Sequence, residues 1–199
     1  LHTCGLTVAG SVYCSGWNIV ASVGDGSTAP RLQLTRVSGT NKYFSVRLGE
    51  AHACALRTTD STAFCWGWNP NGQSGAPVGP NVLTPTALGG GLKFFAISAG
   101  TIHTCGITVT DSLAYCWGQQ ANGRLGNKQT AGANIAAPVA VNTADKFSAI
   151  SAGFEHTCAI RKDGAAFCWG RQFNGRLGNG QVLDANIGYT RQRIGAEGF

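Results

Sequence analysis

The chain contains no methionine and few charged residues: Asp, Glu, Lys and Arg make up 12% of its 199 residues. This excludes a disordered chain, which combines high charge with few large apolar groups. It also disfavours a helical bundle, whose sequence is rich in Ala, Glu, Lys and Leu. No apolar stretch reaches the roughly 18 residues of a membrane-spanning helix, so we expect no membrane insertion. The missing methionine and signal segment lead us to expect a processed piece or an excerpt of a longer chain.

The chain also lacks a run of basic residues. Its formal net charge is +6, but the 15 lysines and arginines are scattered. The densest groups are Arg161-Lys162 and Arg191-Gln192-Arg193. Nucleic-acid binding needs a basic stripe or a recognisable module, and neither is present. We therefore predict no nucleic-acid partner.

Glycine is abundant, with 29 residues, and much of it belongs to an internal repeat of about 50 residues. Four repeats span approximately 1–46, 47–96, 97–148 and 149–199. Each contains a histidine two residues before a cysteine, at His2, His52, His103 and His156. A Cys-x-Gly motif follows, ending at Gly16, Gly67, Gly118 and Gly170, and a further glycine stands at Gly24, Gly75, Gly126 and Gly178.

Each repeat reads as four short strands. In the last one we expect strands at Phe147–Ala152, His156–Arg161 and Ala165–Trp169, with a fourth of the type Pro138–Val141. Four strands in about 50 residues are typical of a propeller blade. The sequence therefore predicts an all-β propeller of four-stranded blades. Because the chain lacks the innermost strand of one blade, we expect an excerpt of a larger ring rather than a closed ring of four blades.

The eight cysteines form one pair in each repeat: Cys4 with Cys14, Cys54 with Cys65, Cys105 with Cys116, and Cys158 with Cys168. If the members of each pair lie opposite one another on adjacent strands, the first and last pairs enclose three-residue turns with glycine third, at Gly10 and Gly164, as such turns require. The middle pairs are one residue further apart and lack that glycine. Their turns centre on Thr59-Asp60 and Thr110-Asp111, which suit a four-residue type I connection.

This agreement between spacing and turn chemistry favours four disulfides, one within each blade. Four disulfides predict an oxidising location: extracellular, cell-surface or periplasmic. Free thiols are one alternative. A metal site is another, because His156, Cys158 and Cys168 could converge, but no fourth ligand recurs.

The sequence Ser-Ala-Gly-x-x-His-Thr-Cys-Ala-Ile, followed by Asp-Gly, Cys-Trp-Gly and Asn-Gly-Arg-Leu-Gly, resembles the regulator-of-chromosome-condensation repeat. The resemblance covers the whole chain and implies a propeller that typically has about seven blades. The superfamily includes nucleotide-exchange factors for a nuclear GTPase, chromatin binders, enzyme inhibitors and surface proteins, so function stays open. The founding nuclear member lacks a bridge in every blade, and its GTPase-facing activity needs an inserted wedge that is absent here. Exported members more often carry the Cys-Trp-Gly pairing.

Positions shared by the repeats are expected to serve the blade. We expect each histidine to make an interblade hydrogen bond, and Trp66, Trp117 and Trp169 to pack between blades. The carboxylates Asp60, Asp111 and Asp163 are explained by hairpin turns. No paired acids, activated serine or phosphate-binding loop is present, so we predict no enzymatic activity and no cofactor.

Positions that differ between repeats are free to serve a partner, and the alternative is that they are simply solvated loops. They lie in the long segment after each Cys-x-Gly motif, and we expect these segments to emerge on one face. The candidate partner-binding residues there are Trp68, Arg124, Lys128, Arg171, Phe173 and Arg176, because aromatic and arginine side chains favour interface cores. We expect replacement of Trp68, Arg124 or Arg176 to leave folding nearly unchanged.

The predicted function is that of a non-enzymatic scaffold or protein-binding propeller of an exported or surface protein. Its partner would be another protein, a copy of itself or the rest of a larger assembly. One alternative is an inhibitor that caps an enzyme active site, which predicts an aromatic-rich patch across several blades. The other is a carbohydrate-binding module, which predicts one similar pocket in each blade.

Overall fold

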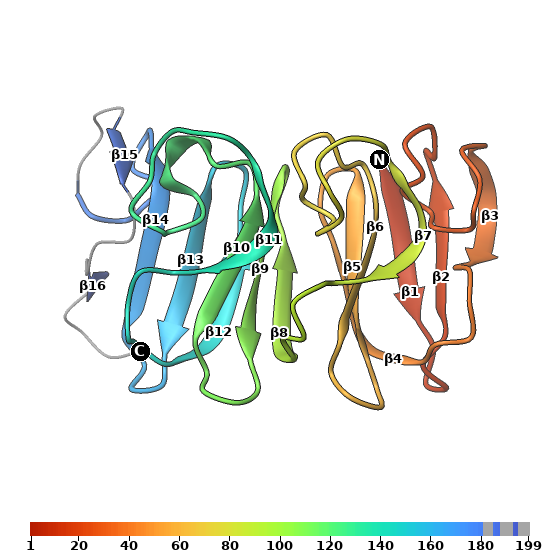
Figure 1. Ribbon diagram of the computed structural model, residues 1–199, viewed down its shortest axis with the longest axis horizontal. Helices are drawn as coiled ribbons and strands as arrows, with labels where there is room; N and C mark the ends of the chain where they lie inside the picture. Colours follow the sequence, from red (N-terminus) through yellow and green to blue (C-terminus); the bar gives the residue numbers. More distant parts are fainter. Residues whose placement is uncertain (181–184, 188–192, 195–199) are drawn as a thin grey trace.

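The computed structural model describes residues 1–180, 185–187 and 193–194, and four antiparallel sheets follow one another along the chain (Figure 1). Blade 1 contains β1 (His2–Leu6), β2 (Val12–Gly16) and β3 (Arg31–Arg36). Blade 2 contains β4 (Tyr43–Leu48), β5 (His52–Arg57), β6 (Ala63–Gly67) and β7 (Val82–Ala87). Blade 3 contains β8 (Phe94–Ala99), β9 (His103–Thr108), β10 (Ala114–Gly118) and β11 (Ile135–Ala140), with a short 3-10 turn, η1, at Ala121–Gly123. Blade 4 contains β12 (Phe147–Ala152), β13 (His156–Arg161), β14 (Ala166–Gln172), β15 (Ala185–Ile187) and β16 (Arg193–Ile194).

Within each four-stranded blade the strands pair in chain order, and the first strands, β4, β8 and β12, lie next to one another. The all-β fold of short antiparallel blades is confirmed. The predicted strands Phe147–Ala152 and His156–Arg161 match β12 and β13. The predicted repeat boundaries, however, fall inside β4, β8 and β12, because each inner strand pairs with the histidine strand that follows it. The blades therefore begin a few residues before the predicted boundaries.

Burial follows the position of a strand in its blade. All residues of β9 are buried, and so are five of the six residues of β5, because a neighbouring blade covers each face. Apart from their histidines and Arg57, these strands consist of residues that are small or apolar, as expected for strands buried on both faces. The outer strand β7 is largely exposed and β11 is partly exposed. They contain Pro85 and Pro138, which have no backbone N–H and therefore suit an edge strand.

The register brings the cysteines of each pair directly opposite one another, with Cα–Cα distances of 4.1 Å, and none of the cysteines is free. The predicted pairing is therefore confirmed in every blade. The four disulfides join Cys4 to Cys14, Cys54 to Cys65, Cys105 to Cys116, and Cys158 to Cys168.

The hairpin turns inside these disulfides follow the cysteine spacing. Gly10 and Gly164 take left-handed φ values of 76° and 88°, as expected for the short turns. In the longer turns Ser61 and Ser112 take that conformation instead, with φ of 59° and 61°. The aspartate before each serine supports the turn, because its carboxylate accepts a hydrogen bond from the backbone N–H of the residue after the serine.

The core lies between the blades. Trp66, Trp117 and Trp169 are fully buried, and each lies in a hydrophobic cluster with a disulfide cysteine of the preceding blade. These cysteines are Cys14 beside Trp66, Cys65 beside Trp117 and Cys116 beside Trp169, and all three are fully buried. The predicted packing role of the tryptophans is confirmed, and the disulfides of blades 1, 2 and 3 contribute to the same interblade core. Within the described residues no helix is long and apolar enough to span a membrane.

Candidate partner-binding face

The long segments that follow the Cys-x-Gly motifs gather on one side of the blades, at the upper edge of Figure 1. We call this side the loop face; it is formed by residues 17–30, 68–81, 119–134 and 173–180. The hairpin turns lie at the opposite edge. Each loop leaves its strand through a glycine with positive φ. At Gly118, for example, φ is 111° and a Cβ atom would lie 2.7 Å from the carbonyl oxygen of Ile102.

A buried amide side chain fixes each loop from within. These side chains are Asn18, Asn69, Gln120 and Gln172, all fully buried at equivalent positions. Asn69 Nδ2 donates to the Pro77 carbonyl at 2.8 Å, and its Oδ1 accepts the Ser74 N–H at 3.1 Å. These four residues were not predicted, although an Asn or Gln recurs two residues after each Cys-x-Gly motif.

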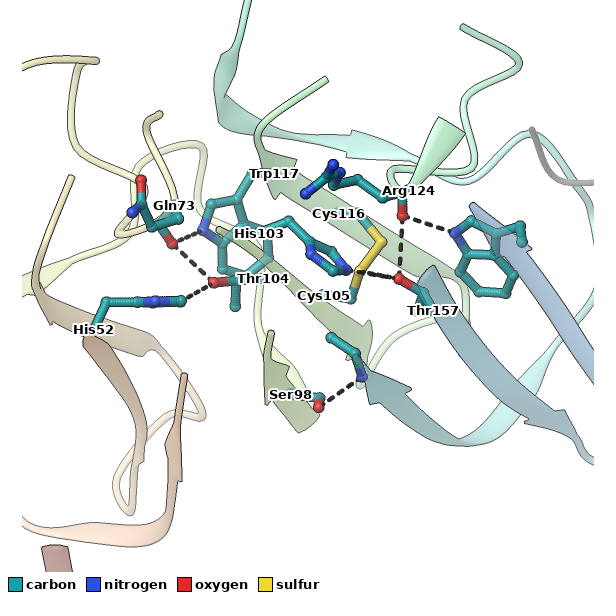
Figure 2. Close-up of a disulfide and its surroundings, with 12 residues drawn as sticks. His52, Gln73, Ser98, His103, Thr104, Cys105, Cys116, Trp117, Arg124 and Thr157 are labelled. Carbon is teal, nitrogen blue, oxygen red and sulfur yellow. Dashed lines mark hydrogen bonds between the residues drawn. A yellow bond between two sulfur atoms is a disulfide. The ribbon is translucent and has the colours of Figure 1, made fainter. Parts of the chain in front are cut away.

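A second set of hydrogen bonds, the interblade clasp, ties the loops of blades 1, 2 and 3 to the blade that follows each of them, as Figure 2 shows for blades 2 and 3. The backbone carbonyl of Gln73 accepts hydrogen bonds from Thr104 Oγ1 at 2.8 Å and from Trp117 Nε1 at 3.0 Å. The Arg124 carbonyl likewise accepts from Thr157 Oγ1 at 3.1 Å and Trp169 Nε1 at 3.0 Å. These hydrogen bonds to the next blade use backbone carbonyls of the loops rather than their variable side chains.

The histidines complete the clasp. His52 Nε2 lies 2.9 Å from Thr104 Oγ1, and His103 Nε2 lies 2.9 Å from Thr157 Oγ1. Because each threonine hydroxyl donates its hydrogen to a carbonyl, its oxygen accepts from the histidine, which therefore carries a proton on Nε2. Burial lowers the pKa of His52 to about 3 and the pKa of His103 well below its usual range.

The predicted interblade hydrogen bond is confirmed at His52 and His103 but is wrong for His2. Both ring nitrogens of His2 are buried without a hydrogen-bond partner among the described residues. The reason is local: blade 2 has Ala53 where blades 3 and 4 have the threonines of the clasp. Burial lowers the pKa of His2 to about 4.

Arg124 does not lie at the surface, so its expected exposure is wrong. Its side chain is 1% exposed, because blade 4 covers it. Nε donates to the Ala121 carbonyl at 2.9 Å, and Nη2 lies 3.5 Å from Glu155 Oε1. Burial lowers the pKa of Arg124 to about 10. Replacing Arg124 would leave Glu155 without its buried cation. We therefore expect this replacement to lower the stability of the fold, in contrast to the prediction from the sequence.

Three other predicted residues do come together around Glu155. Arg171 Nη1 and Arg176 Nη1 lie 3.0 Å and 3.3 Å from Glu155 Oε2. Both guanidinium groups also lie against the ring of Phe173, at 5.3 Å and 5.5 Å from its centroid. Phe173 is 39% exposed. We call Glu155, Arg171, Phe173 and Arg176 the arginine cluster; it presents stacked guanidinium and aromatic surface on blade 4.

The remaining two predicted residues lie apart from this cluster. Lys128 is exposed in the loop of blade 3, with a left-handed φ of 67°. Trp68 is half-buried and lines a cavity with Trp17 of blade 1. The loop face therefore differs from blade to blade.

Within the described residues, no group of three or more His, Cys, Asp and Glu side chains is placed to hold a metal ion. The alternative metal set of His156, Cys158 and Cys168 is incompatible with the disulfide between the two cysteines. The turn carboxylates are engaged locally: Asp60 pairs with Arg57, and Asp163 pairs with Arg161.

The chain matches the regulator of chromosome condensation (RCC1) repeat at residues 45–73, 111–160 and 147–176. It is 31% identical to the ultraviolet-B receptor UVR8 of Arabidopsis thaliana over 205 aligned residues, which cover 99% of this chain and 45% of UVR8.

Two solved structures resemble the fold. Prp20p of Saccharomyces cerevisiae superposes with a TM-score of 0.83 at 22% identity, covering 98% of this chain and 48% of that one. The ectodomain of the receptor kinase CR4 of Physcomitrella patens superposes with a TM-score of 0.60 at 22% identity, covering 92% of this chain and 43% of that one. The chain thus spans about half the length of these relatives, and the total number of blades stays a prediction. With its matching repeats and superposable blades, the chain belongs to the RCC1-like β-propellers.

Proposed function

We propose that the loop face binds another protein, and that the chain belongs to an exported or surface-displayed protein. The observation that carries the binding proposal is that different groups of each loop hold it in place and face the solvent. Buried amides and backbone carbonyls hold the loops, while the exposed side chains differ from blade to blade. Loops fixed before binding lose little conformational freedom when a partner docks.

The arginine cluster is the part of this face that best fits an interface. Aromatic and arginine side chains contribute a large share of binding energy in protein interfaces. Phe173 and Arg176 sit at the surface with their relative positions set by stacking and by Glu155. A carbohydrate-binding module would present similar pockets in each blade, whereas the loop-face side chains here change between blades.

Relatives support a protein partner. The structure of Prp20p was described together with its binding properties to Gsp1p and histones. That protein shares only the fold with this chain, so its partners are not assigned here. The partner of this chain, a second copy of it included, is left to experiment.

The proposed location rests on the disulfides. Four bridges persist in an oxidising compartment and are rare where thiols are kept reduced. The similarity of the fold to a receptor-kinase ectodomain is consistent with this location, because an ectodomain lies outside the cell. Non-reducing peptide mapping of protein taken from its native source tests this: free, alkylatable cysteines would contradict an exported location.

The binding proposal is tested by comparing two double variants in capture from the source organism's surface fraction. Phe173→Ala with Arg176→Ala alters the loop face, whereas Val109→Ala with Lys162→Ala alters exposed positions in the hairpin turns. We expect capture to be lost with the first variant and kept with the second, both melting like the unmodified chain. Equal capture by both variants would show that the loop face of blade 4 is not the binding surface.

A further inference from the structure

One cavity on the loop face has a composition unlike the arginine cluster. It occupies about 420 Å³ where blades 1, 2 and 3 meet, and its walls include Trp17, Trp68, Val20, Ile102 and Glu50. Both tryptophans are half-buried and Glu50 is exposed. Among the described residues that line the cavity, Glu50 is the one with a charged side chain.

The blade does not need tryptophan at either position. Trp17 and Trp68 each directly follow a Cys-x-Gly motif, and the backbone N–H of each donates at 2.9 Å to a carbonyl oxygen, of Leu1 and Ala51 respectively. The same bond, at the same 2.9 Å, forms in blade 3 from Gln119 and in blade 4 from Arg171. Since glutamine and arginine satisfy the fold at this point, the two indole rings are available for binding.

These tryptophans also differ from the packing tryptophans in their hydrogen bonds. The indole N–H groups of Trp66, Trp117 and Trp169 donate to loop carbonyls of the preceding blade. The chain therefore contains one set of tryptophans that holds the blades together and a second, partly exposed pair at a cavity.

Two aromatic rings beside one carboxylate form a site for a cation. The face of an indole ring attracts an ammonium group, and this attraction strengthens when water is excluded. A nearby carboxylate adds a charge that a neutral ligand cannot use. We infer that the cavity lined by Trp17, Trp68 and Glu50 receives an alkylammonium group, which in a protein partner is a lysine side chain. As regards the partner, this inference rests on the proposed protein-binding function.

The inference is tested without a protein partner, by titrating ¹⁵N-labelled chain with choline and with 3,3-dimethyl-1-butanol, its uncharged isostere. We expect choline to shift the indole N–H resonances of Trp17 and Trp68 and to bind at least about fivefold more tightly than the isostere. The resonances of Trp66, Trp117 and Trp169 should stay in place and serve as internal references.

Matched variants locate the site. Trp68→Gln copies the residue of blade 3 and should remove choline binding without unfolding the chain. Glu50→Gln should weaken choline binding about threefold or more, whereas Asp163→Asn, which removes one carboxylate from a hairpin turn, should leave it unchanged. A lysine-containing peptide should then compete with choline, whereas the same peptide with norleucine in place of lysine should not.

Equal or tighter binding of the uncharged isostere would overturn the inference and indicate an apolar occupant. Absence of any shift at Trp17 and Trp68 would also overturn it, as would a choline affinity that Glu50→Gln leaves unchanged. These outcomes are independent of the capture experiment. Failure of the titration leaves the arginine cluster as the binding surface, and failure of capture leaves a cation site with no demonstrated protein partner.

Discussion

The interblade clasp makes Thr157→Val a direct test of how the blades are held together. The Thr157 hydroxyl accepts from His103 Nε2 at 2.9 Å and donates to the Arg124 carbonyl at 3.1 Å, and the residue is fully buried. Valine has nearly the same shape, so the change removes the hydroxyl without leaving a large cavity. The Arg124 carbonyl keeps its hydrogen bond from Trp169, but the His103 N–H loses its acceptor.

The expected loss follows from these contacts. Each hydrogen bond contributes about 1 kcal/mol net, and a buried donor left without a partner costs about 1–3 kcal/mol. We therefore expect the free energy of unfolding to fall by about 2–4 kcal/mol. Urea unfolding followed by tryptophan fluorescence measures this. Thr86→Val, the same change at an exposed position of β7, is the control.

Thr157→Ser keeps the hydroxyl and should recover most of the lost stability, which separates the hydrogen bonds from any change in packing. If Thr157→Val and Thr86→Val lower stability equally, the clasp does not contribute as argued. The nitrogen NMR spectrum of His103 offers a second check, because the clasp requires the proton to be on Nε2. A ring protonated at Nδ1 in the unmodified chain would refute the assigned donor and acceptor roles.

Three further substitutions and a change of pH test the same framework. Ala53→Thr should supply the hydroxyl that His2 lacks and raise the unfolding free energy by about 1–2 kcal/mol in urea titrations; a loss would mean that the space beside Ala53 cannot hold the extra atoms. Because burial lowers the pKa of His2 to about 4 and of His52 to about 3, the unfolded chain binds protons first as the pH falls below about 6.5. Stability should therefore be complete above that pH and decrease towards pH 4 by about 1.4 kcal/mol per pH unit for each such histidine, and a flat profile would refute their neutral burial. Trp117→Ala should destabilise by about 3–5 kcal/mol as a buried large aromatic, whereas Lys128→Ala should leave the melting temperature nearly unchanged.

Much of the fold could be predicted because the chain repeats itself. Comparing blades fixed the strands, and the shift in cysteine spacing together with the turn glycines fixed the register. The turn conformation of Ser61 and Ser112 was missed because serine is not a usual left-handed residue. Here the aspartate before each serine supports the turn through a side-chain hydrogen bond to the backbone.

The position of Arg124 could not be predicted from its motif. Arg124 and Arg176 occupy the same place in two copies of Asn-Gly-Arg-Leu-Gly, yet their side chains are 1% and 24% exposed. The difference arises because Glu155 and the strands of blade 4 lie over Arg124. Burial by a neighbouring blade depends on residues about 30 positions away in the chain, which a local motif does not contain.

The clasp explains why a single position can serve both the fold and a partner. Ser22, Gln73 and Arg124 contribute a carbonyl oxygen to the next blade, and any residue supplies a carbonyl. Four equivalent backbone N–H groups likewise form a hydrogen bond that does not depend on the side chain; they belong to Trp17, Trp68, Gln119 and Arg171. At these four N–H positions the side chain can therefore change without loosening the blades, and it does change, from indole rings on blades 1 and 2 to glutamine on blade 3 and arginine on blade 4. A partner that spans the whole face would meet an aromatic, carboxylate-lined cavity at one end and the arginine cluster at the other. On the proposed binding role, such a partner would need a basic group and an acidic group in a fixed order, and the face would then select for orientation as well as for composition.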